Sequence, residues 1–309
     1  MQKDPLTGKD TCLQGERLPS AREWSALLGD HRERLRALDK LVQTAAECDI
    51  HADKDRDFIL LPEDEVSLLE MTGGIWAEFG SALRSFRRML PLIELDLFGF
   101  DASGEDLFDE NNARLFRIGG GVEALAFESA DKSIYKFYFF RESGEIGATF
   151  NFSRCDDAII QATAVPGSYR LLLEKLLLIH KIGMPTEVVG VTPEGIIVVK
   201  QALGEALAQG VNTSDFLPPH LIPIPSRILR ADRDHPRLYF HDEVPWLLAD
   251  LHARNFARCG DGLLRVIDLV AAPWPGQTTA EYPLIRDWIA RVQQDPAAGL
   301  LAAVDDAEL

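Results

Sequence analysis

Three polar residues near the end of the chain have the types and the order that phosphoryl transfer requires. Asp250 opens the run Asp-Leu-His-Ala-Arg-Asn, Asn255 closes it, and Asp268 follows after a predicted hairpin. In such a set, one carboxylate accepts the proton of the attacking hydroxyl. The amide oxygen and the second carboxylate hold the Mg²⁺ that neutralises the ATP phosphates. Asp and Asn are also common in loops, so the prediction depends on what lies upstream.

A run of three glycines could hold phosphate groups. Gly119, Gly120 and Gly121 lie between two predicted strands. Residues without a side chain let backbone amides approach anionic oxygens closely. A plain hairpin turn is the alternative explanation of the same residues.

A lysine in the next predicted strand is the second upstream feature. In the segment 133–140, side chains alternate between two faces, with Ile134, Lys136 and Tyr138 on one and Tyr135, Phe137 and Phe139 on the other. A lysine in such an apolar strand is costly to bury unless it meets an anion. A solvated lysine on an edge strand would give the same pattern.

The first part of the chain is predicted to be helical. Residues 1–19 are polar and broken by proline and glycine, which predicts a disordered or extended segment. Ser20 begins a capping box, Ser-Ala-Arg-Glu, and a second helical stretch covers 31–46. We expect a helical accessory domain over 20–99, joined to the rest by a polar connection at 100–112.

The pattern changes after this connection. Residues 114–200 predict five strands and one helix, 169–181, inserted between the third and fourth strands. After Gln201 the pattern predicts mostly irregular or helical structure, apart from a hairpin at 256–267.

Taken in order, these parts resemble the protein-kinase-like superfamily over residues 114–275. The form Asp-Leu-His-x-x-Asn is similar to that of aminoglycoside phosphotransferases and related small-molecule kinases. The compact layout resembles the bacterial and phage polyvalent-protein kinase-like group. The resemblance implies an α+β, bilobal fold with a five-stranded antiparallel N-lobe carrying one helix at 113–203. A mostly helical C-lobe would follow at 204–309.

The resemblance also implies roles for the motif residues. The glycines Gly119 to Gly121 would cover the triphosphate, and Lys136 would pair with its α- and β-phosphates. Glu174 would orient Lys136 from the helix, although a solvated partner for a nearby Lys or Arg is equally open. Asp250 would be the catalytic base. The magnesium ligands would be Asn255 and Asp268.

The implied adenine pocket departs from the family pattern. Gln201 to Leu203 would form the hinge that reads adenine, and Ala257 would form part of the floor. Ile134 stands where a small residue is usual above the base, so the pocket should be narrow. Leu248 replaces the histidine that usually precedes the catalytic aspartate by two positions.

The composition argues against some classes of partner. A formal net charge of −17 over 309 residues disfavours a nucleic-acid-binding surface. No apolar run approaches the roughly 18 residues that span a bilayer, and the polar N-terminus lacks the core of a signal peptide. The four cysteines are scattered without a CxxC pair, which suits a reducing compartment. We therefore expect a cytoplasmic protein without nucleic-acid or membrane partners.

These features together predict an ATP- and Mg²⁺-dependent phosphotransferase whose acceptor is a hydroxyl of a small molecule or a protein. A pseudokinase-type nucleotide-binding or regulatory module is the alternative, favoured by Leu248, Ile134 and the absence of Phe-Gly after Asp268. Nucleotidyl transfer by the same fold, and a helical scaffold in which the motif is accidental, also stay open.

Overall fold

A computed structural model describes residues 18–50, 59–101, 107–108, 114–121, 123–139, 145–155, 160–208, 210–232 and 236–298. Most of the predicted N-terminal segment and most of the predicted connection at 100–112 lie outside these residues. The described chain is an α+β protein whose strands form mostly antiparallel sheets.

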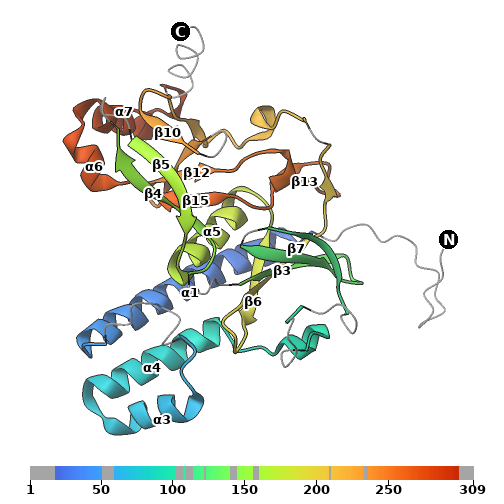
Figure 1. Cartoon of the computed structure of the whole chain (residues 1–309), viewed down its shortest axis with the longest axis vertical. Coiled ribbons are helices and arrows are strands. Elements are labelled where there is room, and N and C mark those ends of the chain that lie inside the picture. Colours follow the sequence, from blue (N-terminus) through green and yellow to red (C-terminus); the bar gives the residue numbers. More distant parts are fainter. Residues whose placement is uncertain are drawn as a thin grey trace, which may run out of the picture.

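The largest sheet has the five strands that the sequence predicts. Its order is β1 (Phe116–Gly120), β2 (Ala124–Glu128), β3 (Ser133–Tyr138), β7 (Ile197–Ala202) and β6 (Thr186–Val191), and all neighbouring strands are antiparallel. Helix α5 (Tyr169–Ile182) begins after Ser168, whose hydroxyl accepts a hydrogen bond from the Leu171 amide. The sheet lies beside α5 and the long helix α1, Ala21–Glu47 (Figure 1).

The two faces of this sheet are covered by different parts of the chain. Tyr135 and Phe137 pack on one face with Phe98 and Phe100, whose rings meet Phe137 edge-on. Tyr138 belongs to the hydrophobic cluster on the other face. The predicted alternation of β3 is therefore confirmed, and Lys136 lies on the same face as Tyr138.

Among the described residues, the α-helices that precede the sheet are α1 (Ala21–Glu47), α3 (Glu63–Thr72) and α4 (Gly74–Met89). The predicted capping box is formed, since the Ser20 hydroxyl accepts from the Glu23 amide and the Glu23 carboxylate accepts from the Ser20 amide. The two stretches predicted at 20–28 and 31–46 are one continuous helix. Gly29 does not break it, because one interior glycine costs only about 1 kcal/mol relative to alanine.

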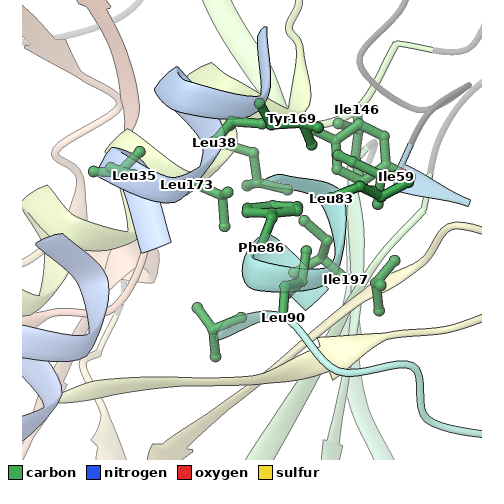
Figure 2. Packing of buried hydrophobic residues seen from close by; sticks show 14 of the residues in the cluster. Leu35, Leu38, Ile59, Leu83, Phe86, Leu90, Ile146, Tyr169, Leu173 and Ile197 are labelled. Atoms are coloured by element: carbon green, nitrogen blue, oxygen red, sulfur yellow. The ribbon is translucent and has the colours of Figure 1, made fainter. Parts of the chain in front are cut away.

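The helices and the sheet share one hydrophobic core. Figure 2 shows Phe86 of α4 amid Leu38 of α1 and Leu173 of α5, and Ile197 of β7 belongs to the same cluster. Phe86 and Leu38 are fully buried. Burial of these helices therefore depends on the sheet and α5, and burial of the sheet depends on the helices.

The part of the chain after β7 differs from the expected mostly helical lobe. Among its described residues, strands predominate, and the α-helices are α6 (Gly276–Glu281) and α7 (Pro283–Gln294). The strands are β8 (Glu205–Ala206), β9 (Ile222–Pro223), β10 (Leu229–Ala231), β11 (Arg237–His241), β12 (Val244–Ala249), β13 (Phe256–Arg258), β14 (Leu264–Val266) and β15 (Val270–Pro273). The prediction of a mostly helical C-lobe over 204–309 was wrong for the described residues, whereas the predicted hairpin is present as β13 and β14.

A further hairpin stands between β3 and α5. Strands β4 (Ala148–Arg154) and β5 (Ile160–Pro166) are antiparallel, and β10 joins β5 in parallel. The four-stranded sheet β15-β12-β11-β9 lies beside this hairpin, where the Thr149 hydroxyl donates to the Ala271 carbonyl at 3.0 Å. The second half of the chain is thereby attached to a segment from the first half.

Replacing Phe86 by alanine should lower the free energy of unfolding by about 3–5 kcal/mol, because a fully buried ring leaves a cavity. Urea titration would measure it, with Leu68→Ala as a control at a side chain that is 66% exposed. If Phe86→Ala instead unfolded in a separate transition at low urea, with the main transition unchanged, the result would contradict a core shared by the helices and the sheet.

The stability should also fall on acidification because of His31. Burial, reinforced by Arg34, lowers the pKa of His31 from 6.5 to about 3, and its Nε2 lies 2.8 Å from the Thr186 carbonyl. The unfolded chain therefore binds more protons between these pH values, so stability present above pH 6.5 is lost as pH falls. From pH 7.5 to 5.0 the His31 contribution is about 2 kcal/mol. In urea titrations at both pH values, His31→Gln should lose less stability than the wild type; equal losses would contradict the assignment.

Candidate active site

The register of the sheet places Gly119, Ala126 and Lys136 in one row across β1, β2 and β3. Neighbouring strands are about 4.8 Å apart, so the glycine lies two strands from the lysine. Lys136 is buried, and its Nζ donates to the Ile267 carbonyl at 2.6 Å. Because Ile267 directly precedes Asp268, this bond connects the sheet to the second predicted magnesium ligand.

The loop between β12 and β13 holds the first acid and the amide. Asp250 adopts a left-handed backbone conformation with φ of 65°, which is uncommon outside glycine and recurs at functional sites. Asn255 Nδ2 donates to the Asp250 carbonyl at 2.7 Å and to Asp250 Oδ2 at 3.2 Å. His252 Nε2 lies 3.1 Å from Asp250 Oδ1. The Asp250 carboxylate is thus fixed from two sides.

This loop is bonded directly to the strand that leads to Asp268. The Ile267 amide donates to the Asn255 carbonyl at 2.8 Å. The Ile267 carbonyl accepts from Lys136. One residue therefore bridges the loop and the sheet, and the structure brings together the surroundings of Asp250, Asn255, Asp268 and Lys136.

A lysine on α5 completes the cluster. Lys175 Nζ lies 2.5 Å from Glu123 Oε1 and 3.0 Å from Asp268 Oδ1, and it stands over the Tyr138 ring at 5.5 Å from the centroid. Its side chain is 1% exposed. Burying an ammonium is costly unless opposite charges meet it, and here two carboxylates do so.

The charges of this cluster shift one another's pKa values. Burial alone would lower the pKa of Lys175, but Asp268 and Glu123 outweigh it and raise that pKa. Burial lowers the pKa of Lys136, and the nearby Lys175 adds to this effect while Asp268 opposes it. The pKa of Asp268 is lowered, since the two lysines outweigh the burial of its carboxylate. Burial raises the pKa of Glu123 in spite of Lys175.

Glu174 does not pair with Lys136. Its carboxylate lies 3.2 Å from Arg170 and 3.3 Å from His241 Nε2. Neighbouring residues of a helix point about 100° apart, so Glu174 and Lys175 face different surroundings. The sequence offered a signal that the prediction missed. α5 is apolar on nearly all sides, and a lysine inside such a helix requires buried counter-charges.

The glycine run lies where β1 turns into β2, and Gly119 is in the same cross-strand row as Lys136. Gly119 and Gly120 belong to β1, and the Gly121 amide donates to the Ala124 carbonyl at 2.9 Å. A Cβ at Gly120 would lie 2.8 Å from the Leu125 side chain, so glycine permits this close approach. The plain-turn explanation accounts for these contacts, and a role in holding phosphate stays a prediction.

The residues of the predicted adenine pocket make contacts with other parts of the protein. Gln201 lies in β7 with its amide 2.9 Å from the Thr186 hydroxyl, and the Leu203 amide donates to the Lys132 carbonyl. Ile134 is buried in β3. Ala257 is also buried, since β8 pairs with β13.

The contacts around Ala257 are close. A Cβ built on Gly204 would lie 2.7 Å from the Ala257 Cβ. Leu18, Ala202 and Ile267 pack against the small cluster that contains Ala257. A base could therefore touch Ala257 only after these residues separate.

The oxygens available for a divalent cation come from two residues. Asp268 Oδ1 accepts from Lys175 and from the Leu269 amide at 2.9 Å, which leaves Oδ2 for a ligand. The Asn255 amide group donates through nitrogen, which leaves its oxygen. One carboxylate and one amide oxygen fit Mg²⁺, which takes few protein ligands together with phosphates and water. Within the described residues, no group of three or more His, Cys, Asp and Glu side chains is arranged to hold a metal.

No family model, no curated protein and no solved structure matches the chain. The kinase-like family inferred from the motifs therefore stays a prediction, and the functional proposals depend on the geometry. None of the described helices combines the length and apolar character needed to cross a bilayer.

The Asp250–Asn255 contacts predict a measurable cost for removing the amide. Asn255→Asp replaces a double donor by a carboxylate that faces Asp250, so stability should fall by about 1–3 kcal/mol. Asn151→Asp, at an exposed position of β4, is the matched control and should leave stability nearly unchanged. Equal urea midpoints for all three proteins would show that the described loop contacts do not stabilise the fold.

Proposed function

We propose that the chain is an ATP-dependent phosphotransferase that acts on a hydroxyl of a small molecule or a protein. The observation that supports it best is the meeting of residues from distant parts of the sequence. Lys136 on β3 is bonded to the residue before Asp268, and that same residue is bonded to Asn255. Asn255 in turn holds Asp250.

In the proposed reaction, Asp250 is the general base. Its carboxylate is oriented by His252 and Asn255 and takes the proton of the acceptor hydroxyl as the oxygen attacks the γ-phosphorus. The new bond joins that oxygen to phosphorus, the bond to the bridging oxygen breaks, and ADP leaves. Lys136 would contact the phosphates after releasing the Ile267 carbonyl. Asp268 and Asn255 would hold Mg²⁺, which neutralises phosphate charge when bound.

A regulatory module of the pseudokinase type is the second candidate. It is favoured by the burial of Ala257, the expected floor of the adenine pocket, in a small cluster against which Leu18, Ala202 and Ile267 pack. The ion pair between Lys175 and Asp268 also favours the regulatory module, because it occupies one oxygen of the predicted magnesium ligand.

ATP binding and hydrolysis would separate the two candidates. We expect ATP with Mg²⁺ to raise the melting temperature of the full chain and inorganic phosphate to be released slowly to water. Asp250→Ala should lower phosphate release by about 100-fold or more while nucleotide binding persists, because a general base contributes 10²–10⁴-fold. Asp268→Ala should abolish the Mg²⁺-dependent part of binding.

The control is Asp215→Ala, which removes an exposed acid in the 3₁₀ helix η2 (Ser214–Phe216). Binding without any release would favour the regulatory module, and absence of both would contradict each candidate. ATP labelled at the α- or the γ-phosphate distinguishes the chemistry: transfer of the α-label to protein or acceptor would indicate nucleotidyl transfer.

A further inference from the structure

Lys175 is anchored on both sides of its ammonium group. Glu123, in the bend just before β2, lies 2.5 Å away, and Asp268 lies 3.0 Å away. The long, flexible side chain is therefore held in one position between Glu123 and the loop that joins β14 to β15, which carries Asp268. A lysine fixed in this way can impose an orientation on a neighbouring carboxylate.

Asp268 is oriented by contacts to one of its two carboxylate oxygens. Its Oδ1 receives both the Lys175 ammonium and the Leu269 amide. These contacts are made to Oδ1 and not to Oδ2, and the Asp268 side chain is 26% exposed. Lys175 itself is 1% exposed, so it lies behind the carboxylate and away from the open side.

We propose that Lys175 is the positioning residue for Asp268, with Glu123 as its anchor. Lys175 holds Oδ1 from behind so that Oδ2 faces the cation and the phosphates. This inference rests on the proposed function, because it concerns the same nucleotide site. Lys175 is not a catalytic residue, since its buried ammonium does not reach the reacting groups. The pair expected between a helix acid, Glu174, and a strand lysine is thus replaced by a pair of opposite polarity. In it, the helix supplies the lysine and the bend before β2 supplies the acid.

The test measures binding of a non-hydrolysable ATP analogue by calorimetry, with Mg²⁺ and with a chelator, on the full chain. Lys175→Met should weaken Mg²⁺-dependent binding by about 10-fold or more, as expected when a partner of a metal ligand is removed. Binding in chelator should stay unchanged. Lys175→Arg should stay within about 3-fold of the wild type because it retains the charge. Glu174→Gln, the neighbouring residue on the same helix, is the matched control.

A charge exchange separates positioning from simple structural pairing. The double variant Glu123→Lys with Lys175→Glu restores an ion pair between positions 123 and 175. It also places a carboxylate, in place of the ammonium, beside Asp268. We expect its melting temperature to recover relative to Lys175→Met, while Mg²⁺-dependent binding stays lost. Recovery of both would overturn the inference.

Two other outcomes also decide the matter. If the wild type binds the analogue and Lys175→Met binds it with the same or a tighter Mg²⁺ dependence, the inference fails while the proposed function stands. If the wild type binds no nucleotide, both fail. Should Lys175→Met not fold, Glu123→Gln replaces it, because it loosens the anchor and keeps the lysine; unchanged Mg²⁺-dependent binding would then overturn the inference.

Discussion

The buried cluster of two lysines and two carboxylates is the constraint on which the site depends. Lys136 comes from β3, Lys175 from α5, Glu123 from the bend before β2 and Asp268 from the loop after β14. None of these charges is stable alone in an apolar interior, so each element must keep its place for the others to be paired. The same requirement fixes the distance between the sheet and the loop that carries Asp250.

The parts that the sequence predicted have local signals. The five strands, α5 and the capping box at Ser20 follow from alternation, helical periodicity and capping chemistry. The proximity of Lys136 to Asp268 was expected from motif order, and the Lys136–Ile267 bond is consistent with it. Asn255 and His252 contact Asp250 because they are close in sequence, where spacing is informative.

The parts that it did not predict depend on tertiary contacts. β12 is a nearly continuous apolar run, which does not distinguish a buried strand from a buried helix. Hairpin β4–β5 obtains a third strand from β10, far along the chain, and local propensity carries no sign of that pairing. The role of Lys175 was not predicted because adjacent residues on a helix point in different directions. Whether Glu174 or Lys175 faces the site depends on the position of Glu123, which is distant in sequence.

Helix α5 also limits how the molecule can admit a ligand. It shares the core of α1 and α4, and the Trp24 indole and the His180 ring each bond to the other residue's backbone carbonyl. Its last turn packs with Leu248 and Val266 on the opposite side. A rigid-body rotation of the five-stranded sheet away from the strands that follow it, about residues 203–204, would have to break this continuous packing. Such a rotation would therefore expose apolar surface on both sides of α5, so its cost grows with the burial that the helix provides.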